Sequence, residues 1–180
     1  MERTEDVFAY LRWIDQQVKQ HAAGMPEIEK RGEQWQAVAV LIADRRMLVP
    51  LDEVRAILPP PRMVALPRAK SWVAGLANMR GELTGVYDLS QFLFDKPNAH
   101  SRHNVVLLAK HDHEVAFLVD RSFGIRLIDY GNEQPVDPDQ TPEIDELPGV
   151  VQTTIEEQTR LPILSLKSLM QDEQFSNVVA

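Results

Sequence analysis

The spacing of hydrophobic positions changes near Trp35. Between residues 5 and 22, apolar side chains recur at helical spacing, which predicts an amphipathic helix. From Trp35 onward, short apolar runs are separated by glycine, proline and charged turns, a pattern typical of β-strands. We expect an N-terminal helix and linker over residues 1–34, a folded domain over residues 35–171 and a C-terminal tail over residues 172–180. The helix packs either on its own domain or on a partner, and an apolar stripe alone leaves both open.

The first two predicted strands differ in how they meet their neighbours. Gln36 to Ala43 is apolar on both faces, so we expect it to be covered on both sides. Pro50 falls inside the next apolar run, and because proline cannot donate a hydrogen bond to a neighbouring strand, we expect an edge strand or a bulge there. The two faces of the first strand consist of Val38, Val40 and Ile42 on one side and Ala37, Ala39 and Leu41 on the other.

Two patterns each occur twice along the chain. Val40–Ile57 and Val106–Ile125 both run from a strand through a polar turn and a second strand to an acid and a further apolar run. Val86–Leu93 and Ile163–Met170 both run from a strand end through a capping residue into a short amphipathic helix. We therefore expect two related β units packed against one another, as small barrels or a sandwich. The expected capping residues are Asp88 and Ser165.

Composition narrows the classes of partner. The formal net charge is -8, so the molecule repels phosphate backbones and anionic lipids, and we expect no nucleic-acid partner. The chain has no cysteine, which suits a reducing, cytoplasmic compartment. The longest apolar run, Ala37 to Ala43, is far shorter than the roughly 20 residues of a membrane-spanning helix. The acidic first residues do not match a secretory signal, so we expect no membrane insertion.

Few residues suggest catalysis or metal binding. The sequence contains neither a Gly-x-Ser-x-Gly elbow nor a Gly-x-Gly-x-x-Gly loop, so neither nucleophilic catalysis nor a phosphate cradle is indicated. His111 and His113, together with the acids between residues 131 and 148, allow the alternative of a small β-barrel enzyme that uses a metal. Their spacing fits no metal motif, and the acid- and proline-rich segment is typical of an exposed loop. We expect no catalytic residue, no cofactor and no metal, and thus no enzyme.

The stretch Asn78-Met79-Arg80-Gly81 lies between two apolar strand segments and predicts a tight turn that carries one basic side chain. Three interpretations fit this turn. It is a plain hairpin, a pocket whose arginine meets an acidic substrate, or an exposed turn that a partner protein recognises. The lack of catalytic groups weakens the second interpretation, and spacing alone does not separate the other two.

The segment Gly75–Leu83, followed by Val86-Tyr87-Asp88-Leu89, resembles the signature of CheW-like domains: glycine, two residues, Asn-x-Arg-Gly, an apolar strand, Asp-Leu and a helix. The similarity continues in family order through the hairpin that begins at Trp35, the second hairpin at Asn104–Asp120 and the Leu161–Leu164 strand with its final helix. It covers about residues 35 to 171. This resemblance implies a mainly β fold of two packed, five-stranded SH3-like β-barrels with short helices and an N-terminal helix.

The resemblance also implies a function. CheW-like proteins are non-catalytic adaptors that couple a methyl-accepting chemoreceptor to a CheA-type histidine kinase, so the chain is expected in the cytoplasm, recruited to membrane-associated receptor arrays. By this analogy a receptor-binding groove between the barrels contains Asn78 and Arg80, with Gly75 supporting its shape and Val54 and Ile57 lining its apolar wall. The kinase contact falls on barrel surfaces that the resemblance does not assign to residues.

Some positions depart from the common family pattern. Ala56 stands where a glutamate is frequent, Gly85 where a proline is common and Arg121 where a glycine is common. The predicted N-terminal helix is also longer than a minimal adaptor needs. These features are similar to the type IV pilus, or twitching motility, branch of the family, whose members are PilI-like adaptors.

Overall fold

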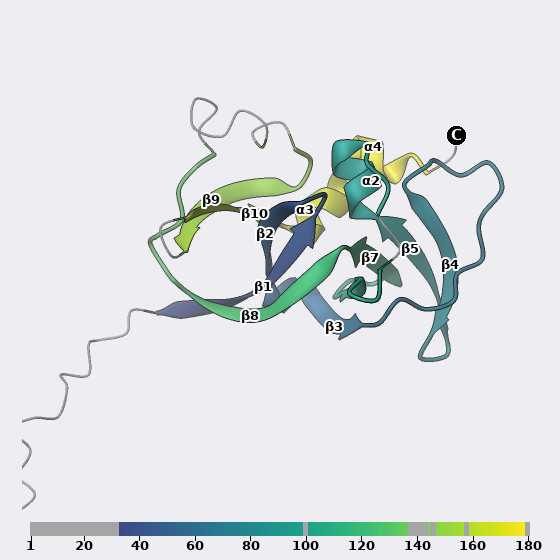
Figure 1. The fold of residues 1–180 in the computed structure, drawn as a ribbon, viewed down its shortest axis with the longest axis horizontal. Helices are drawn as coiled ribbons and strands as arrows, with labels where there is room; N and C mark the ends of the chain where they lie inside the picture. The colour runs from purple at the N-terminus through teal and green to yellow at the C-terminus, as the bar shows by residue number, and fades with distance from the viewer. Residues whose placement is uncertain (1–32, 99–100, 137–143, 145–146, 157–158, 179–180) are drawn as a thin grey trace, which may run out of the picture. The chain divides into compact units, whose positions relative to one another are not determined.

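The computed structural model describes residues 33–98, 101–136, 144, 147–156 and 159–178. The predicted N-terminal helix lies outside the described residues, as does half of the predicted loop between residues 131 and 148. Ten strands and a few short helical segments make up the described part (Figure 1). The elements are β1 (Gln34–Ile42), β2 (Arg45–Pro50), η1 (Leu51–Glu53), β3 (Val54–Leu58), β4 (Val73–Met79), β5 (Glu82–Asp88), α2 (Leu89–Phe94), β6 (Val105–Ala109), β7 (Val115–Val119), β8 (Arg121–Asp129), β9 (Val150–Glu156), β10 (Thr159–Leu164), α3 (Leu166–Gln171) and α4 (Glu173–Ser176).

The strands form two five-stranded sheets with equivalent orders. The first, which we call barrel A, has the order β8-β1-β2-β10-β9, and the second, barrel B, has the order β3-β6-β7-β5-β4. Each strand of one barrel corresponds to the strand five numbers away in the other, so that β1 corresponds to β6 and β8 to β3. This equivalence confirms the internal repeat and the mainly β, two-barrel class. The first repeat unit consists of β1 to β5 and the second of β6 to β10, but neither unit forms a barrel by itself. The hairpin β1-β2 pairs with strands of the second unit, whereas β6-β7 pairs with strands of the first.

This exchange happens at β3 and β8, the strands that leave one sheet and enter the other. Each follows an acid at the end of a hairpin, Glu53 before β3 and Asp120 before β8. The Glu53 carboxylate accepts hydrogen bonds from the Ser165 hydroxyl at 3.0 Å and from the Lys167 backbone N–H at 3.1 Å, at the start of α3. The repeat-related Asp120 carboxylate contacts the first turn of α2. Both crossovers are therefore tied by a carboxylate to a helix of the other repeat unit.

The Asp120 contacts are equally short. Its carboxylate accepts hydrogen bonds from the Ser90 hydroxyl at 3.0 Å and from the Ala43 backbone N–H at 2.7 Å, so it also holds the β1-β2 turn. The expected caps are present as well. Asp88 accepts hydrogen bonds from the backbone N–H groups of Ser90 and Gln91 at the start of α2, and Ser165 accepts one from the N–H of Ser168 in α3.

Apolar side chains pack in three clusters. The largest joins both sheets and lies between them, and smaller clusters fill the inside of each barrel. In β1, Val38, Val40 and Ile42 belong to the cluster between the sheets, whereas Ala37 and Ala39 belong to the interior of barrel A. The expectation of a strand covered on both faces is confirmed, with Leu41 half-buried at its end.

The expectation for Pro50 is wrong. The strand β2 lies inside the sheet, between β1 and β10, and Pro50 is its last residue, paired with Ala37. The chain turns into η1 immediately afterwards. Proline is tolerated there because the strand ends at this residue, so the missing N–H interrupts no further ladder.

The C-terminal residues that we assigned to a tail include a short helix packed on barrel B. Phe175 of α4 is 6% exposed and stacks on Trp72, with ring centroids 5.4 Å apart. The rings of Tyr87, Phe92 and Phe117 also contact Phe175, with centroids 5.0 to 5.6 Å apart. The backbone N–H of Lys70 donates to the carbonyl of Val178 at 3.0 Å. The aromatic contacts make α4 part of the folded core.

Candidate partner-binding surface

The Asn-x-Arg-Gly stretch forms the two-residue turn between β4 and β5. Met79 and Glu82 are the last paired residues, and both turn residues have positive φ, 55° at Arg80 and 91° at Gly81. This is the backbone of a type I′ turn, whose twist matches that of the flanking strands. The Asn78 side-chain oxygen accepts a hydrogen bond from the Gly81 N–H at 3.0 Å. The motif thus encodes a fixed hairpin tip, and Arg80 stands exposed at its end.

Gly75 has a different role in the same strand. Its φ is 140°, and a Cβ added to it would lie 2.4 Å from the carbonyl oxygen of Val64. The backbones of Val64 and Leu76 exchange hydrogen bonds of 2.8 and 2.9 Å at this point, so the loop after β3 pairs with β4. Only a residue without a side chain allows this close approach. Gly75 is buried and shapes barrel B from within.

The strand β3 presents one predicted residue to solvent and buries the other. Ile57 is 37% exposed, whereas Val54 is 8% exposed and belongs to the cluster between the sheets. Val54 therefore cannot contact a partner directly and can only support the surface from beneath. Arg55 forms an ion pair with Glu114, and its Nη2 lies 3.6 Å from Oε2 of Glu82. Because Glu82 directly follows the Arg80 turn, this contact brings β3 beside the hairpin tip.

Of the predicted site residues, the structure thus places Asn78, Arg80 and Ile57 at the surface. Sequence reasoning missed several exposed aliphatic side chains on β5 and β8. Leu83 is 69% exposed and is paired with Asn78 across the hairpin. In β8, Ile125 and Leu127 are 51% and 56% exposed. Apolar residues alternate with other residues in the second half of β8, but such alternation predicts that the apolar face is buried, so it gives no signal of this exposure.

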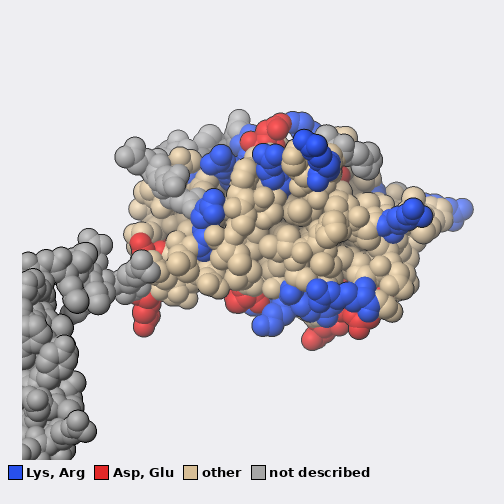
Figure 2. Space-filling view, turned by 60° about the horizontal axis from the view of Figure 1, so that its bottom comes forward, with Lys and Arg blue, Asp and Glu red and all other residues tan. Residues whose placement is uncertain are grey.

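Charge is unevenly distributed on the face that carries β3 and β8. Both strands lie at the bottom of Figure 1 and come forward in Figure 2, where the middle of the face is uncharged and charged side chains of both signs stand along its borders. An exposed apolar area rimmed by charged residues is typical of protein-binding surfaces.

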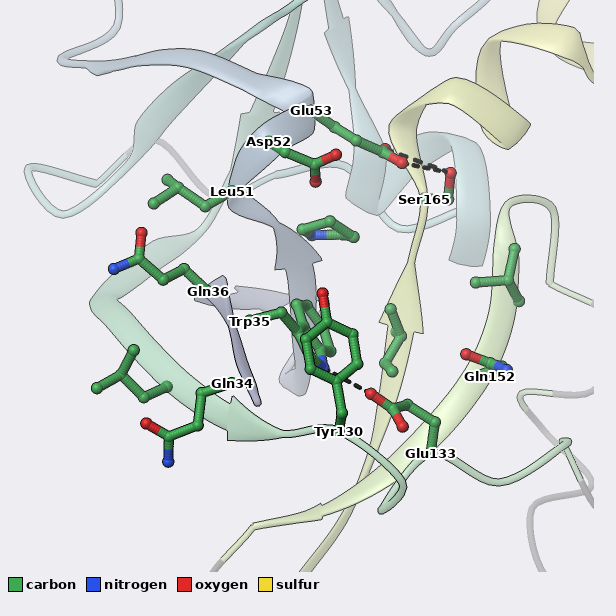
Figure 3. A pocket seen from close by; sticks show the side chains of 14 residues that line it. Gln34, Trp35, Gln36, Leu51, Asp52, Glu53, Tyr130, Glu133, Gln152 and Ser165 are labelled. Atoms are coloured by element: carbon green, nitrogen blue, oxygen red, sulfur yellow. Dashed lines mark hydrogen bonds between the residues drawn. The ribbon is translucent and has the colours of Figure 1, made fainter. Parts of the chain in front are cut away.

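A separate pocket of about 860 Å³ opens at one end of barrel A (Figure 3). None of the five predicted site residues lines it. Trp35 and Tyr130 supply aromatic surface, and the Trp35 indole N–H donates to Glu133 at 2.6 Å. Burial alone would raise the pKa of Glu133, but hydrogen bonds from its own backbone N–H, from the Gly131 N–H and from Trp35 together lower that pKa. Glu133 is therefore a fixed negative charge at the pocket.

The histidines and the helices bear on two other possibilities, a metal site and a membrane-spanning segment. His111 and His113 lie in the β6-β7 turn with ring centroids 5.5 Å apart, and within the described ranges no three histidine or acidic side chains are grouped to hold a metal ion. His100 and all acids of the loop from residue 137 to residue 148 lie outside those ranges. Among the helices that the structure describes, none has the length and hydropathy needed to cross a membrane.

The paired five-stranded barrels and the Asn-x-Arg-Gly hairpin define a CheW-like domain, and the family model of that description matches residues 36–174. The chain belongs to this family. It is 32% identical to protein PilI of Pseudomonas aeruginosa over 127 residues, which cover 70% of this chain and 71% of PilI. It is 22% identical to the chemotaxis protein CheW of Thermotoga maritima over 93 residues, covering 52% of this chain and 62% of that protein.

The solved structures agree on the fold. The scaffolding protein TtCheW of Thermoanaerobacter tengcongensis superposes with a TM-score of 0.68 over 78% of this chain and 95% of that protein, at 15% sequence identity. The likeness in fold at such low identity shows that the two-barrel arrangement depends on patterning more than on particular residues.

Proposed function

We propose that this protein is a non-catalytic adaptor that couples a methyl-accepting chemoreceptor to a CheA-type histidine kinase, in the signalling that controls type IV pili and twitching motility. Membership of the CheW-like family and the similarity to PilI support the assignment. The observation that carries it is the exposed Arg80 on a fixed hairpin tip, joined through Glu82 and Arg55 to the strand that exposes Ile57.

This surface suits a helical receptor tip. Exposed Ile57 and Leu83 provide apolar area, and the Arg80 guanidinium provides a fork for a carboxylate or a backbone carbonyl. The hairpin fixes the backbone of Arg80, so the backbone loses little conformational freedom on binding. One such contact is weak, but receptor arrays present many copies, which raises the effective concentration of each partner. Recruitment to membrane-associated arrays then needs no membrane anchor in the described domain.

Coupling of receptor to kinase requires a second contact. In the proposal the adaptor binds the kinase through another barrel surface, and the state of the receptor alters the kinase through a coupling free energy of about 1 to 3 kcal/mol. No atom of the adaptor takes part in phosphoryl transfer. An adaptor of this kind changes kinase activity only when both partners are present, which separates it from an enzyme.

The test is binding of the purified protein to a receptor cytoplasmic-tip fragment and to the kinase, measured by biolayer interferometry. Arg80→Glu should weaken receptor binding at least tenfold, about 1.4 kcal/mol, and leave kinase binding unchanged. Arg102→Glu, a charge reversal at another exposed position, is the control and should bind normally. Normal receptor binding by Arg80→Glu would refute the assigned surface. Absence of any complex with both partners, all of them folded, would refute the adaptor function.

A further inference from the structure

The pocket of Figure 3 combines acidic and aromatic side chains. Its lining contains the carboxylates of Asp52, Glu53 and Glu133 and no lysine or arginine. Every strand of barrel A contributes at least one lining residue, so the sheet itself fixes the walls. A concave, partly apolar site with a few placed polar groups is the usual form of a small-molecule site, and a volume of about 860 Å³ suffices for such a ligand.

The Glu53 carboxylate indicates the sign of the charge that the pocket accepts. Glu53 is 8% exposed, and its oxygens accept hydrogen bonds from the Ser165 hydroxyl and the Lys167 backbone N–H. Among the described residues, no lysine, arginine or histidine side chain forms an ion pair with it. Carboxylates buried to this degree are ordinarily paired with a cation. Because two carboxylate oxygens offer about four acceptor positions, Glu53 can accept further hydrogen bonds.

Two further carboxylates face the same pocket. The Asp52 side chain is 74% exposed, and its contact with the Lys167 ammonium is long, at 3.7 Å. Glu133 comes from the loop after β8 and is held by the Trp35 indole N–H at 2.6 Å. In Figure 3, Asp52 and Glu53 stand at one side of the pocket and Glu133 stands at the opposite side. The negative charge is therefore divided between two sides.

Apolar surface separates the two acidic sides. Trp35 is half-buried and Tyr130 is 59% exposed, and in Figure 3 their rings lie between the two groups of carboxylates. Aromatic faces attract ammonium groups, and aliphatic lining gains from contact with methylene groups. The pocket thus matches a methylene chain with a positive charge at each end. The other apolar lining residues are Pro50, Leu51, Leu127, Val151 and Ile163.

We propose that this pocket binds a linear polyamine, a small molecule in which methylene chains separate ammonium groups. One ammonium group contacts the carboxylates of Asp52 and Glu53, and another contacts Glu133. The methylene chain between them lies along the rings of Trp35 and Tyr130. A monoamine satisfies only one acidic side, so the spacing of two charges is the basis of selectivity. None of the residues assigned to receptor binding lines this pocket, so the proposal does not depend on the receptor contact.

Calorimetry and heteronuclear NMR of the full chain, titrated with spermidine and putrescine, test the proposal. Both amines should bind one to one and shift the signal of the Trp35 indole N–H, because that group donates to Glu133. The chain has three tryptophans, and the spectrum of Trp35→Phe identifies the signal. n-Butylamine has the carbon chain of putrescine but a single charge, and it should bind at least about tenfold more weakly than putrescine.

Three variants separate the pocket from general attraction to an acidic protein. Glu133→Gln removes a charge but keeps an oxygen that accepts from Trp35, and Tyr130→Ala removes a ring whose hydroxyl makes no described hydrogen bond. Each should weaken spermidine binding at least about fivefold. Asp112→Asn removes a charge at an exposed position outside the pocket and should bind spermidine like the wild type. Circular dichroism checks that each variant is folded.

Three results would overturn the proposal. The first is a Trp35 signal in the wild type that does not move at about 10 mM spermidine in about 50 mM salt, where screening is weak. The second is equal affinity for putrescine and n-butylamine, since both comparisons use the unaltered protein. The third is an equal effect of Glu133→Gln, Tyr130→Ala and Asp112→Asn, which would show that spermidine responds only to the net charge of -8.

Discussion

Glu53 and Ser165 are separated by 112 positions in the chain, yet the Ser165 hydroxyl donates to the Glu53 carboxylate at 3.0 Å within the buried part of the domain. Glu53 is 8% exposed, and its second oxygen accepts from the Lys167 backbone N–H, so one carboxylate satisfies both the cap residue and the first turn of α3. The contact joins the point where the chain leaves barrel A to the helix that follows the last strand of the same barrel.

Glu53→Ala should lower the free energy of unfolding by about 2 kcal/mol, because the Ser165 hydroxyl and the Lys167 N–H lose their acceptor in a site that water enters poorly. Urea unfolding followed by circular dichroism measures the change. The adjacent Asp52 is the matched control: its side chain is 74% exposed and lies 3.7 Å from the Lys167 ammonium. Asp52→Ala should cost under about 0.5 kcal/mol. Equal losses of unfolding free energy in the two variants would show that the buried Glu53 contact contributes no more to stability than the exposed Asp52 contact.

Gly75→Ala should destabilise the protein more than Gly124→Ala. Both glycines have positive φ, 140° and 87°, but a Cβ at Gly75 would meet the Val64 carbonyl, whereas a Cβ at Gly124 would have nothing within 4 Å. Crowding against backbone adds to the cost of the conformation itself, and we expect Gly75→Ala to lose about 2 kcal/mol more in urea unfolding. Hydrogen exchange should also speed up at the Val64 and Leu76 amides. Similar losses at both glycines would contradict the assigned close contact.

The pH dependence of stability should include a contribution from Asp88. Burial raises the pKa of this carboxyl above its ordinary 3.8, and nearby Asp120 adds to the rise, while the N–H groups of Asn98, Gln91 and Ser90 oppose it. Just above pH 3.8 the folded state therefore binds more protons than the unfolded state, so stability falls as pH rises through this window.

Asp88→Asn removes this titration, and asparagine caps a helix about as well as aspartate. The free-energy difference between wild type and Asp88→Asn should therefore shift in favour of the variant between pH 3.5 and pH 6. Urea unfolding at several pH values within that range measures it. A difference that does not change with pH, or that shifts in favour of the wild type, would show that the folded carboxyl does not have a raised pKa.

Phe175→Ala should cost about 3 to 5 kcal/mol, because the ring packs against Trp72, Tyr87, Phe92 and Phe117 and its loss leaves a cavity in the cluster between the sheets. Thermal unfolding measures the loss, and removal of residues 172–180 should have an effect of similar size. Gln174→Ala changes the exposed neighbour in the same helix and should leave the midpoint within a few degrees of wild type. A truncated protein as stable as the full chain would contradict the role of α4 in the core.

Local features were predictable from the sequence because they depend on neighbouring residues. The repeat of strand and cap patterns, the caps at Asp88 and Ser165, and the turn at Asn78–Gly81 each rest on short-range chemistry, and the structure contains them. The resemblance to CheW-like domains supplied the pairing of the barrels. Residue patterns alone had left a choice between barrels and a sandwich.

The long-range features were not predictable in the same way. Nothing in the alternation of β3 or β8 tells which sheet a strand joins, because both sheets offer apolar faces and the connecting turns are short. Val54 and Ile57 were assigned to one apolar wall through the family resemblance, although they stand three positions apart in a strand, so alternation places their side chains on opposite faces. The pocket of barrel A combines residues from five strands, and Phe175 lies in a segment too short to show a helical period.

The order of the strands has a consequence for biosynthesis. All strands of barrel B lie between residues 54 and 119, whereas barrel A combines the hairpin at residues 34–50 with strands that end at Leu164. As the nascent chain leaves the ribosome, the first hairpin emerges early but meets its partners last, with its apolar faces uncovered in the interval. All strands of barrel B have been translated by then, but the barrel packs fully only after Phe175 has been translated. Nearly the whole domain must therefore be translated before either barrel reaches its final packing, and until then the side chains of Val38 and Val40 lack their partners.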